Sequence, residues 1–275
     1  MTTRPGHARQ TCYPAKGSAS RRILQPGSFP AEAAKLLPVS VAVIGGTGDE
    51  GFGLSLRLAR AGEDVVIGSR AEDRGQAAAQ KAADILGLGS GSGTRGGIEG
   101  TSNEKAAAAC DIVFVTVPYA GQAEIYRSIK DALRPGAIVC DTTTPLATAV
   151  GRPAWHVVTP WEGSAAEQAK AILPKGMRLV SGFQTVSGHA LQELEHDLEG
   201  DVLLCGAEAE AKAAIGALVE KIPNLRWIDA GPLSMARIVE PLTAVLVSVN
   251  RVYGTDRAGI ALTGKDAWGP PRAQG

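Results

Sequence analysis

The stretch Val41-Ala-Val-Ile-Gly-Gly-Thr-Gly-Asp-Glu-Gly51 decides the fold of this chain. The apolar run Val39–Ile44 is typical of a buried parallel strand, and the pattern G-x-G-x-x-G follows it directly, at Gly46, Gly48 and Gly51. In dinucleotide-binding folds such glycines permit a tight turn, a close approach of the pyrophosphate and close packing of the next helix. The N-terminus of that helix would offer free N–H groups to phosphate. The stretch therefore predicts a dinucleotide site, with a merely structural glycine turn as the alternative.

The end of the next expected strand indicates which dinucleotide is bound. An NAD-binding protein places Asp or Glu about 20 residues beyond the glycines, against the ribose 2′-hydroxyl. Here the chain reads Gly68-Ser69-Arg70, with Arg74 one helical turn further on. A guanidinium group can hold a 2′-phosphate through two hydrogen bonds, whereas an acid would repel it. We therefore expect NADP(H); the alternative is that both arginines are ordinary solvated residues at a helix start.

Strand-like and helix-like segments alternate along the rest of the chain. Helical patterns cover Glu72–Leu86 and Asn103–Ala109, and strands are expected at Val65–Ile67, Ile112–Val117 and Arg178–Ser181. The alternation predicts an α/β fold, a doubly wound Rossmann-type parallel sheet with a smaller C-terminal α/β domain, which binds its ligand at the carboxyl ends of the strands. The expected division is a disordered basic extension over 1–38, an NADP-binding Rossmann domain over 39–199 with a flexible Gly-rich insertion at 87–97, the smaller C-terminal domain over 200–263, and a frayed tail over 264–275.

Local signals place some helix ends. Thr101 with Glu104, and Ser164 with Glu167, have the spacing of capping boxes. The last helix carries the clearest apolar stripe, in which Pro241 should cause a kink. The stripe consists of Met235, Ile238, Val239, Leu242, Val245, Leu246 and Val249.

Composition excludes several classes of function. The 275 residues carry 28 basic and 28 acidic side chains, which argues against a nucleic-acid binder. This balance combines a net charge of +5 over residues 1–38 with −5 over the rest. No uninterrupted apolar run reaches the roughly 20 residues that span a bilayer, so no membrane association is expected. Four widely spaced cysteines suit a reducing compartment, hence the cytoplasm. His189, Glu193 and His196 could share a helical face, but a solvated face is expected there and no metal site.

Four segments resemble one family, the NADPH-dependent coenzyme F420 reductases (F420H2:NADP+ oxidoreductases). These segments are Val41–Gly48, Val65–Arg70, Cys110–Pro118 and, most specifically, Asp229-Ala-Gly-Pro-Leu-Ser-Met-Ala-Arg-Ile-Val-Glu-Pro-Leu-Thr243. The resemblance covers about residues 39–263. It implies NADP(H) and coenzyme F420 as the two cofactors, a direct hydride transfer between C4 of the nicotinamide and C5 of the deazaflavin, and a homodimer formed through the C-terminal helix. Because the cofactors carry the chemistry, no catalytic acid or base is required.

The resemblance also implies roles for particular residues. The segment Phe183–Ser187 is similar to the stretch that brings the deazaflavin against the nicotinamide, so Gln184, Thr185 and Ser187 are expected as ring-positioning donors; an ordinary polar turn is the alternative. The expected cofactor-binding residues are Gly46, Thr47, Gly48, Gly51, Ser69, Arg70, Arg74 and Pro118.

Some features of the sequence leave alternatives open. Asp49 and Glu50 lie beside the expected pyrophosphate, and we expect their side chains to point to solvent. The phosphate and glutamate tail of F420 needs a local basic patch, for which Arg152, Lys175 and Arg178 are candidates. The alternative functions are an NADPH-dependent reductase of another small acceptor (a flavin, imine or ketone) and a non-catalytic NADPH-sensing protein.

Overall fold

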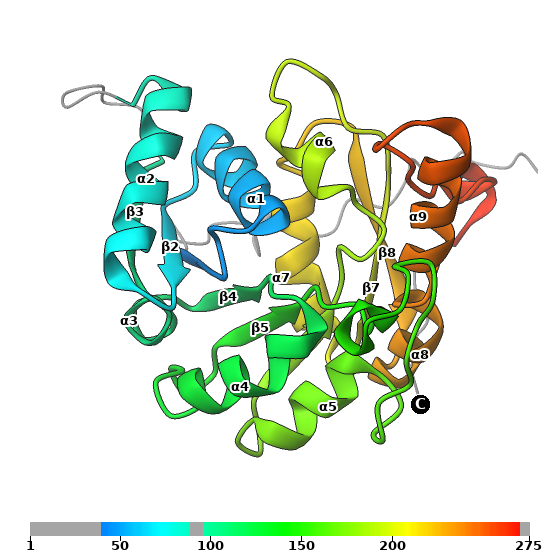
Figure 1. Ribbon diagram of the computed structural model, residues 1–275, viewed down its shortest axis with the longest axis horizontal. Helices are drawn as coiled ribbons and strands as arrows, with labels where there is room; N and C mark the ends of the chain where they lie inside the picture. Colours follow the sequence, from blue (N-terminus) through cyan, green and yellow to red (C-terminus); the bar gives the residue numbers. More distant parts are fainter. Residues whose placement is uncertain (1–39, 89–95, 270–275) are drawn as a thin grey trace, which may run out of the picture. The chain divides into compact units, whose positions relative to one another are not determined.

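The computed structural model describes residues 40–88 and 96–269 (Figure 1). The expected basic extension 1–38 lies outside the described residues, as do the centre of the Gly-rich insertion and the last six residues of the expected frayed tail. The first part of that tail is described and contains a 3-10 turn at Lys265–Ala267.

The described residues build one eight-stranded, mostly parallel sheet in the order β3-β2-β1-β4-β5-β6-β7-β8. The order reverses between β1 and β4, as in doubly wound dinucleotide-binding folds. β7 runs antiparallel to β6, and β8 runs parallel to β7. The predicted fold class is confirmed. The strands are β1 Val41–Ile44, β2 Val65–Ser69, β3 Ile98–Ser102, β4 Ile112–Val115, β5 Ile138–Asp141, β6 Arg178–Ser181, β7 Gly200–Gly206 and β8 Leu225–Gly231.

Helices cover both faces of the sheet because alternate side chains of each central strand point to opposite faces. In β1, Val41 and Val43 join a core cluster with α1, α2 and α7, while Ala42 and Ile44 join a second cluster with α3, α4 and α5. The helices are α1 Asp49–Arg60, α2 Glu72–Leu86, α3 Asn103–Ala109, α4 Tyr119–Ile129, α5 Ala165–Ile172, α6 Gly188–Gln192 and α7 Ala209–Val219.

The capping signals were predictive at one helix and wrong at another. Ser164 caps α5 by accepting from the N–H of Glu167, and its hydroxyl donates to the Glu167 carboxylate, as predicted. The cap of α3 is Ser102, not Thr101. The reason is that β3 continues to Ser102, which pairs with Ser69 of β2, so Thr101 is still part of the strand.

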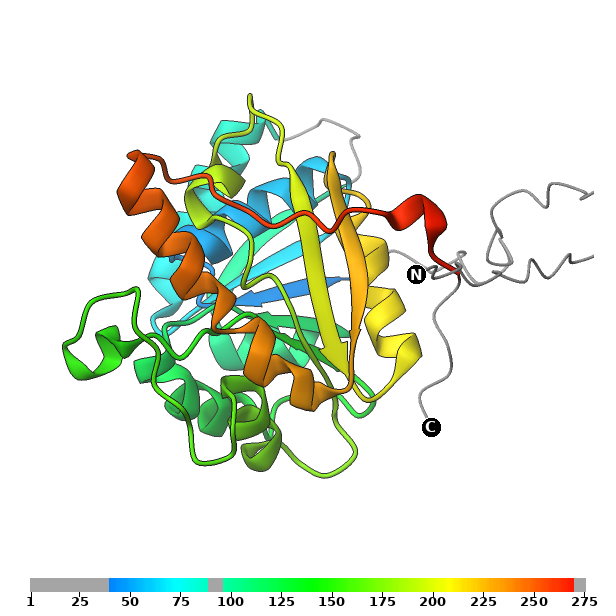
Figure 2. The same ribbon diagram turned by 90° about the vertical axis from the view of Figure 1, so that its right-hand side faces the viewer.

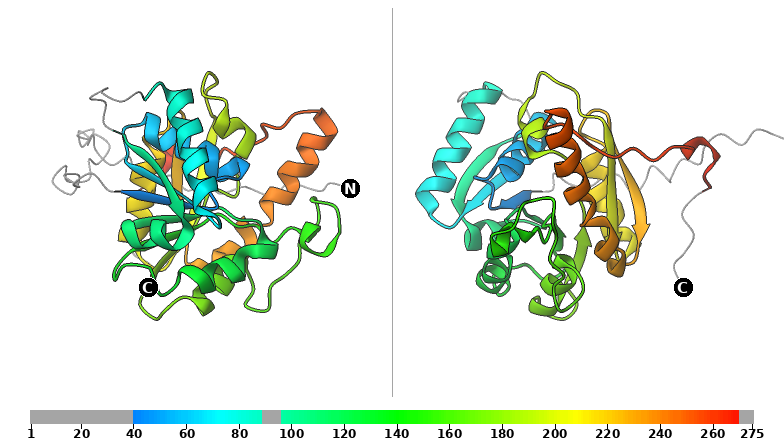
Figure 3. Two further views of the ribbon diagram at one scale, coloured as in Figure 1. Left: turned by 60° about the vertical axis from the view of Figure 1, so that its left-hand side comes forward. Right: turned by 45° about the vertical axis from the view of Figure 1, so that its right-hand side comes forward.

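Pro241 divides the C-terminal helical stretch, as its position predicts. A 3-10 turn at Leu233–Met235 and the short helix α8, Ala236–Val239, come before it, and α9, Leu242–Tyr253, follows it. Figure 3 shows α9, in orange, projecting away from the sheet. The apolar stripe is therefore split between two environments, since Val239 and Leu246 are buried whereas Ile238 and Val245 are exposed.

The 21 residues Leu233–Tyr253 have the length and composition of a helix that could cross a membrane. These residues do not form an uninterrupted apolar run, because Arg237 and Glu240 lie within them. Both side chains are bonded to the α5 region: Arg237 pairs with Glu167 at 2.6 Å, and Glu240 accepts from the N–H groups of Ala165 and Ala166. The expected absence of a membrane partner stays a prediction.

The strands expected in a smaller C-terminal domain continue the same sheet. β7 pairs with β6 at Ser181–Cys205, and Val202 and Leu204 of β7 belong to the core cluster that also contains Leu54 of α1. Figure 2 shows the segment after α9 crossing β7 and β8. The proposed boundary between residues 199 and 200 stays a prediction.

Candidate functional site

The glycine-rich turn between β1 and α1 has the geometry of a phosphate-binding turn. Gly45, just before the motif, takes the left-handed conformation with φ +76°, which favours glycine. A Cβ atom on Gly51 would lie 2.3 Å from Oγ1 of Thr116, so α1 approaches β4 too closely for any side chain there. Gly48 caps α1 without a side-chain hydrogen bond, which leaves the first N–H groups of the helix for an anion.

The end of β2 presents the two predicted arginines. Arg70 and Arg74 are exposed, and neither forms an ion pair with another described residue. Glu72, which lies between them in sequence, is held by Lys105 at 2.8 Å, so its charge is already compensated. Ser69 is buried and Thr47 is exposed. This edge of the sheet can therefore hold a 2′-phosphate.

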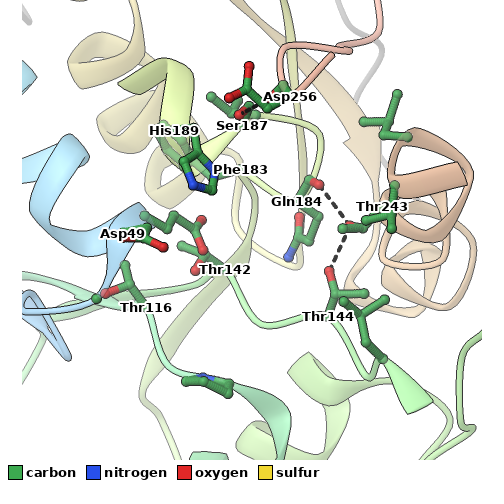
Figure 4. A pocket seen from close by; sticks show the side chains of 18 of the residues that line it. Asp49, Thr116, Thr142, Thr144, Phe183, Gln184, Ser187, His189, Thr243 and Asp256 are labelled. Carbon is green, nitrogen blue, oxygen red and sulfur yellow. Dashed lines mark hydrogen bonds between the residues drawn. The ribbon is translucent and has the colours of Figure 1, made fainter. Parts of the chain in front are cut away.

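A cavity of about 560 Å³ lies at the carboxyl ends of the strands (Figure 4). Its wall combines the start of α1 with the residues that follow β4, β5 and β6, and with α6 and α9. Four of the predicted site residues line it: Gly48, Pro118, Gln184 and Ser187. Its polar wall residues also include Asp49, Glu50, Thr116, Thr142, Thr143, Thr144, His189, Thr243, Asn250, Thr255 and Asp256.

Gln184 is 5% exposed and lines this cavity. Its Nε2 donates to the carbonyl oxygen of Asp141 at 3.1 Å and to the Ser181 hydroxyl at 2.9 Å, while its Oε1 is buried without a partner among the described residues. The preceding Phe183 has φ +75°, a costly conformation that is held by burial and by an edge-to-face contact with Phe114 at 5.6 Å. The turn therefore fixes the orientation of Gln184.

The other two expected ring-positioning residues use their hydroxyl groups within the protein. Thr185 donates to the carbonyl oxygen of Asp201 at 3.0 Å and lines a separate cavity of about 390 Å³. Ser187 lines both cavities, donates to the carbonyl oxygen of Asp256 and accepts from the N–H of Ala190 as the cap of α6. Their expected role toward the deazaflavin stays a prediction.

Thr243 connects three parts of the cavity wall, which sequence reasoning did not single out. Its hydroxyl donates to the carbonyl oxygen of Gln184 at 2.7 Å and lies 2.8 Å from the Thr144 hydroxyl (Figure 4). The start of α9 is thus joined to the ends of β5 and β6. A lone threonine in an apolar helix gives no signal for such a contact in the sequence.

Two acidic side chains near the cavity are shielded from solvent: Asp141 is fully buried, and Glu50 is half-buried with its Oε1 covered. Asp141, at the end of β5, accepts from Gln122, Tyr126 and the N–H of Thr143 at 2.6–2.7 Å, and burial raises its pKa. The expectation that Glu50 points to solvent is wrong, because its carboxyl packs against the end of β5, where burial raises its pKa to about 8. Asp49 is exposed, as expected.

The structure removes two of the three candidates for a basic patch. Lys175 and Arg178 lie at the amino end of β6, the opposite edge of the sheet from the cavity. Arg152 follows the 3-10 turn Ala147–Val150, which comes after the carboxyl end of β5, but it does not line the cavity. Charge alone could not distinguish these edges, because the direction of a strand follows from its pairing.

The residues considered for a metal do not form a metal-binding group. α6 ends at Gln192, so Glu193 and His196 follow the helix, where Nδ1 of His196 lies 3.7 Å from Oε2 of Glu193. In the described part of the chain no cluster of His, Cys, Asp and Glu has the geometry of a metal site. Cys110, Cys140 and Cys205 are free and buried.

Comparison with known proteins agrees with this architecture. Residues 40–145 match the family model described as NADP oxidoreductase coenzyme F420-dependent. F420-dependent NADP reductases from Methanothermobacter thermautotrophicus and Methanocaldococcus jannaschii are 38% and 37% identical over 83% and 82% of this chain, and 97% and 98% of their own lengths. A crystal structure from Arthrobacter sp. FB24, described as an F420-dependent NADP reductase, superposes with a TM-score of 0.68 at 22% identity over 82% of this chain and 99% of that chain. The chain belongs to the family of F420-dependent NADP reductases.

Proposed function

We propose that this protein transfers a hydride between NADP(H) and the deazaflavin coenzyme F420. The observation that carries the proposal is the connection of two sites: the uncapped start of α1 opens directly onto the 560 Å³ cavity at the strand ends. A dinucleotide whose pyrophosphate lies at α1 would place its adenosine half toward Arg70 and its other half in this cavity. The names of the two methanogen relatives support both cofactors.

The residues of this chain bind and orient the two ring systems. Arg70 and Arg74 hold the 2′-phosphate, and the N–H groups at the start of α1 hold the pyrophosphate. When bound, NADP(H) and F420 supply hydride-donating and hydride-accepting carbon atoms. Gln184 lines the cavity, and its Oε1, which has no partner among the described residues, is the acceptor that we assign to a ring N–H group. Thr243 fixes α9 against Gln184, so the wall stays closed to water on that side.

The test is a coupled absorbance assay with purified protein. Mixing the protein with NADPH and F420 should bleach the deazaflavin, and NADP+ with reduced F420 should restore its absorbance. FMN in place of F420 is the control acceptor and should be reduced much more slowly. Absence of bleaching by a protein that still binds NADPH would contradict the proposal, and faster reduction of FMN would favour another acceptor.

The assembly and the compartment belong to the same proposal. The protein is a homodimer that associates through α9, whose outward side exposes Val245, Val252 and Tyr253. An apolar side of this kind on an otherwise charged chain is typical of a self-association surface. The protein works in the cytoplasm, which is supported by three free, buried thiols in the described part of the chain.

A further inference from the structure

Glu50 brings a buried carboxyl group to the wall of the cavity. It is the second residue of α1 and lines the 560 Å³ cavity. Its Oε1 is buried and has no hydrogen-bond partner among the described residues. A buried carboxyl oxygen without a partner costs free energy unless a proton or a ligand satisfies it. The group takes no part in capping α1, since that cap involves no side chain.

The location of Glu50 assigns it to one half of the dinucleotide. The strand order reverses between β1 and β4, and a dinucleotide lies across such a switch point. Arg70 and Arg74 follow β2, on one side of β1. The Glu50 carboxyl lies on the other side, near Thr142 and Asp141 at the end of β5. It therefore faces the nicotinamide half.

The charges around Glu50 give its carboxylate little compensation. Asp141 lies behind it in the core, and Asp49 and Asp256 share the cavity wall. No Lys or Arg lines this cavity in the described part of the chain, where His189 of α6 is the one lining group that can become positive. Burial first, and the charge of Asp141 in addition, raise the pKa of Glu50 to about 8. In the absence of a cation, the protonated form is favoured at neutral pH.

Thr142 can serve both protonation states of Glu50. Its hydroxyl donates to the carbonyl oxygen of Val115 at 3.2 Å, and it lies close enough to the Glu50 carboxyl to lower the pKa of that group. With its proton on Val115, the hydroxyl oxygen accepts from protonated Glu50. After rotation about the C–O bond, the same hydroxyl donates to the Glu50 carboxylate. Neither state therefore leaves this contact unsatisfied.

We propose that Glu50 responds to the charge of the nicotinamide ring, being protonated beside NADPH and ionised beside NADP+. The ring of NADP+ is a cation, and the ring of NADPH is neutral. A cation in this cavity supplies the missing counter-charge, so exchange of NADPH for NADP+ lowers the pKa of Glu50 and releases protons from it to solvent. The proposal rests on the NADP(H)-binding half of the proposed function and does not depend on F420.

The consequence is a pH-dependent preference between the two forms of the cofactor. As pH rises, ionised Glu50 favours NADP+, so the ratio Kd(NADP+)/Kd(NADPH) falls. Titration of the 2′-phosphate is common to both ligands and cancels in this ratio. A tenfold fall corresponds to a difference of about one unit between the pKa values of Glu50 in the two complexes.

Binding of both ligands to the full chain tests the proposal without any turnover. NADPH is titrated by its fluorescence, and NADP+ by competition, at intervals between about pH 6.5 and 9.5, which bracket the titration of Glu50. We expect the ratio to fall about tenfold in the wild-type chain. The ratio should stay constant within twofold in Glu50→Gln. It should fall as in wild type in Asp131→Asn, which removes an exposed charge that does not line the cavity.

Three further measurements keep the outcomes distinct. 2′,5′-ADP, which lacks the nicotinamide half, should bind wild type and Glu50→Gln equally; failure of wild type to bind it would contradict the NADP assignment itself. If only Glu50→Gln fails to bind 2′,5′-ADP, the variant cannot test the proposal. The number of protons released is then measured on the wild-type chain, by calorimetry at pH 8 in two buffers of different ionisation enthalpy. Release of protons as NADP+ replaces NADPH supports the proposal, and no release overturns it. A ratio Kd(NADP+)/Kd(NADPH) that does not change with pH in the wild-type chain overturns the proposal. The proposal is also overturned if this ratio still falls with pH in Glu50→Gln but no longer falls in His189→Asn.

Discussion

Arg70 follows β2 as an exposed guanidinium group with no acidic partner in the described part of the chain. Removing it in Arg70→Ala should weaken NADPH binding by about 10- to 100-fold, since charge-assisted hydrogen bonds contribute about 1.5–3 kcal/mol. The affinity for NADH should change less than about threefold, because NADH lacks the 2′-phosphate. Fluorescence titration with both ligands measures this. Lys175→Ala, which removes a charge at the opposite edge of the sheet, is the control, and equal losses for NADPH and NADH would contradict the assignment.

Glu50 and Glu240 should make folding stability depend on pH. Burial raises the pKa of each to about 8, although Glu240 also accepts two N–H groups of α5. Each carboxyl ionises near its usual pKa in the unfolded chain but stays protonated in the folded chain. The folded state then binds more protons, so the free energy of unfolding falls as pH rises from about 5 to 8, by at most about 1.4 kcal/mol per unit for each group.

Urea unfolding of the apo protein at several pH values measures this slope. Glu240→Gln should reduce the slope while lowering stability at acidic pH, because the amide can accept only through its single oxygen. The exposed Glu104→Gln should leave the slope unchanged. Stability that rises over this pH range would show that both carboxyl groups are ionised in the native protein.

At the scale of elements, the close approach of α1 to β4 can be tested at Gly51. In Gly51→Ala the new Cβ would lie 2.3 Å from the Thr116 hydroxyl oxygen and 2.8 Å from the Cα of Gly46. We expect a loss of about 1–3 kcal/mol in unfolding free energy and weaker NADPH binding, because the start of α1 must move. The matched control is Gly121→Ala in α4, where a Cβ meets nothing within 4 Å, and it should stabilise the protein by about 0.5–1 kcal/mol. Equal effects in both variants would refute the tight contact.

The exposed side of α9 is a second feature that can be tested at the scale of elements. Val245 and Val252 lie two turns apart and are 56% and 73% exposed. If a second copy covers them, the double variant Val245→Asp/Val252→Asp should convert a dimer into a monomer of 28.3 kDa in light scattering. Ile85→Asp on α2, at a residue 49% exposed, should leave the mass of the assembly unchanged. A wild-type protein that is already monomeric would exclude the dimer.

At the scale of the whole molecule, β7 and β8 complete a core that begins at β1. Leu204 of β7 and Leu218 of α7 share a cluster with Val43 and Leu54. A fragment comprising residues 39–199 should therefore fail to fold, because that cluster loses one side. A fragment comprising 39–275 should unfold cooperatively and bind NADPH like the full chain, since every residue assigned to the site lies within it. Circular dichroism and NADPH titration of both fragments measure this, and a stable 39–199 fragment would support the expected domain boundary.

The sequence by itself determined the fold class and the family, because short-range patterns carry both. The apolar run before Gly46 and the three glycines can satisfy backbone conformation and packing in few other ways, and α2 and α3 have the ranges expected from their helical patterns. Arg70 was identifiable because its role follows from its distance along the chain from those glycines.

Only the tertiary structure decided which side chains meet at the cavity. Thr243 reaches Gln184 across 59 positions, and Glu50 packs beside Asp141 across about 90, distances over which no local pattern operates. Lys175 and Arg178 have the charge expected of a basic patch, yet strand direction places them at the far edge. The ionisation of Glu50 is likewise decided only by the tertiary structure. A carboxyl pKa depends on burial and on neighbouring charges, and both exist only once the chain has folded.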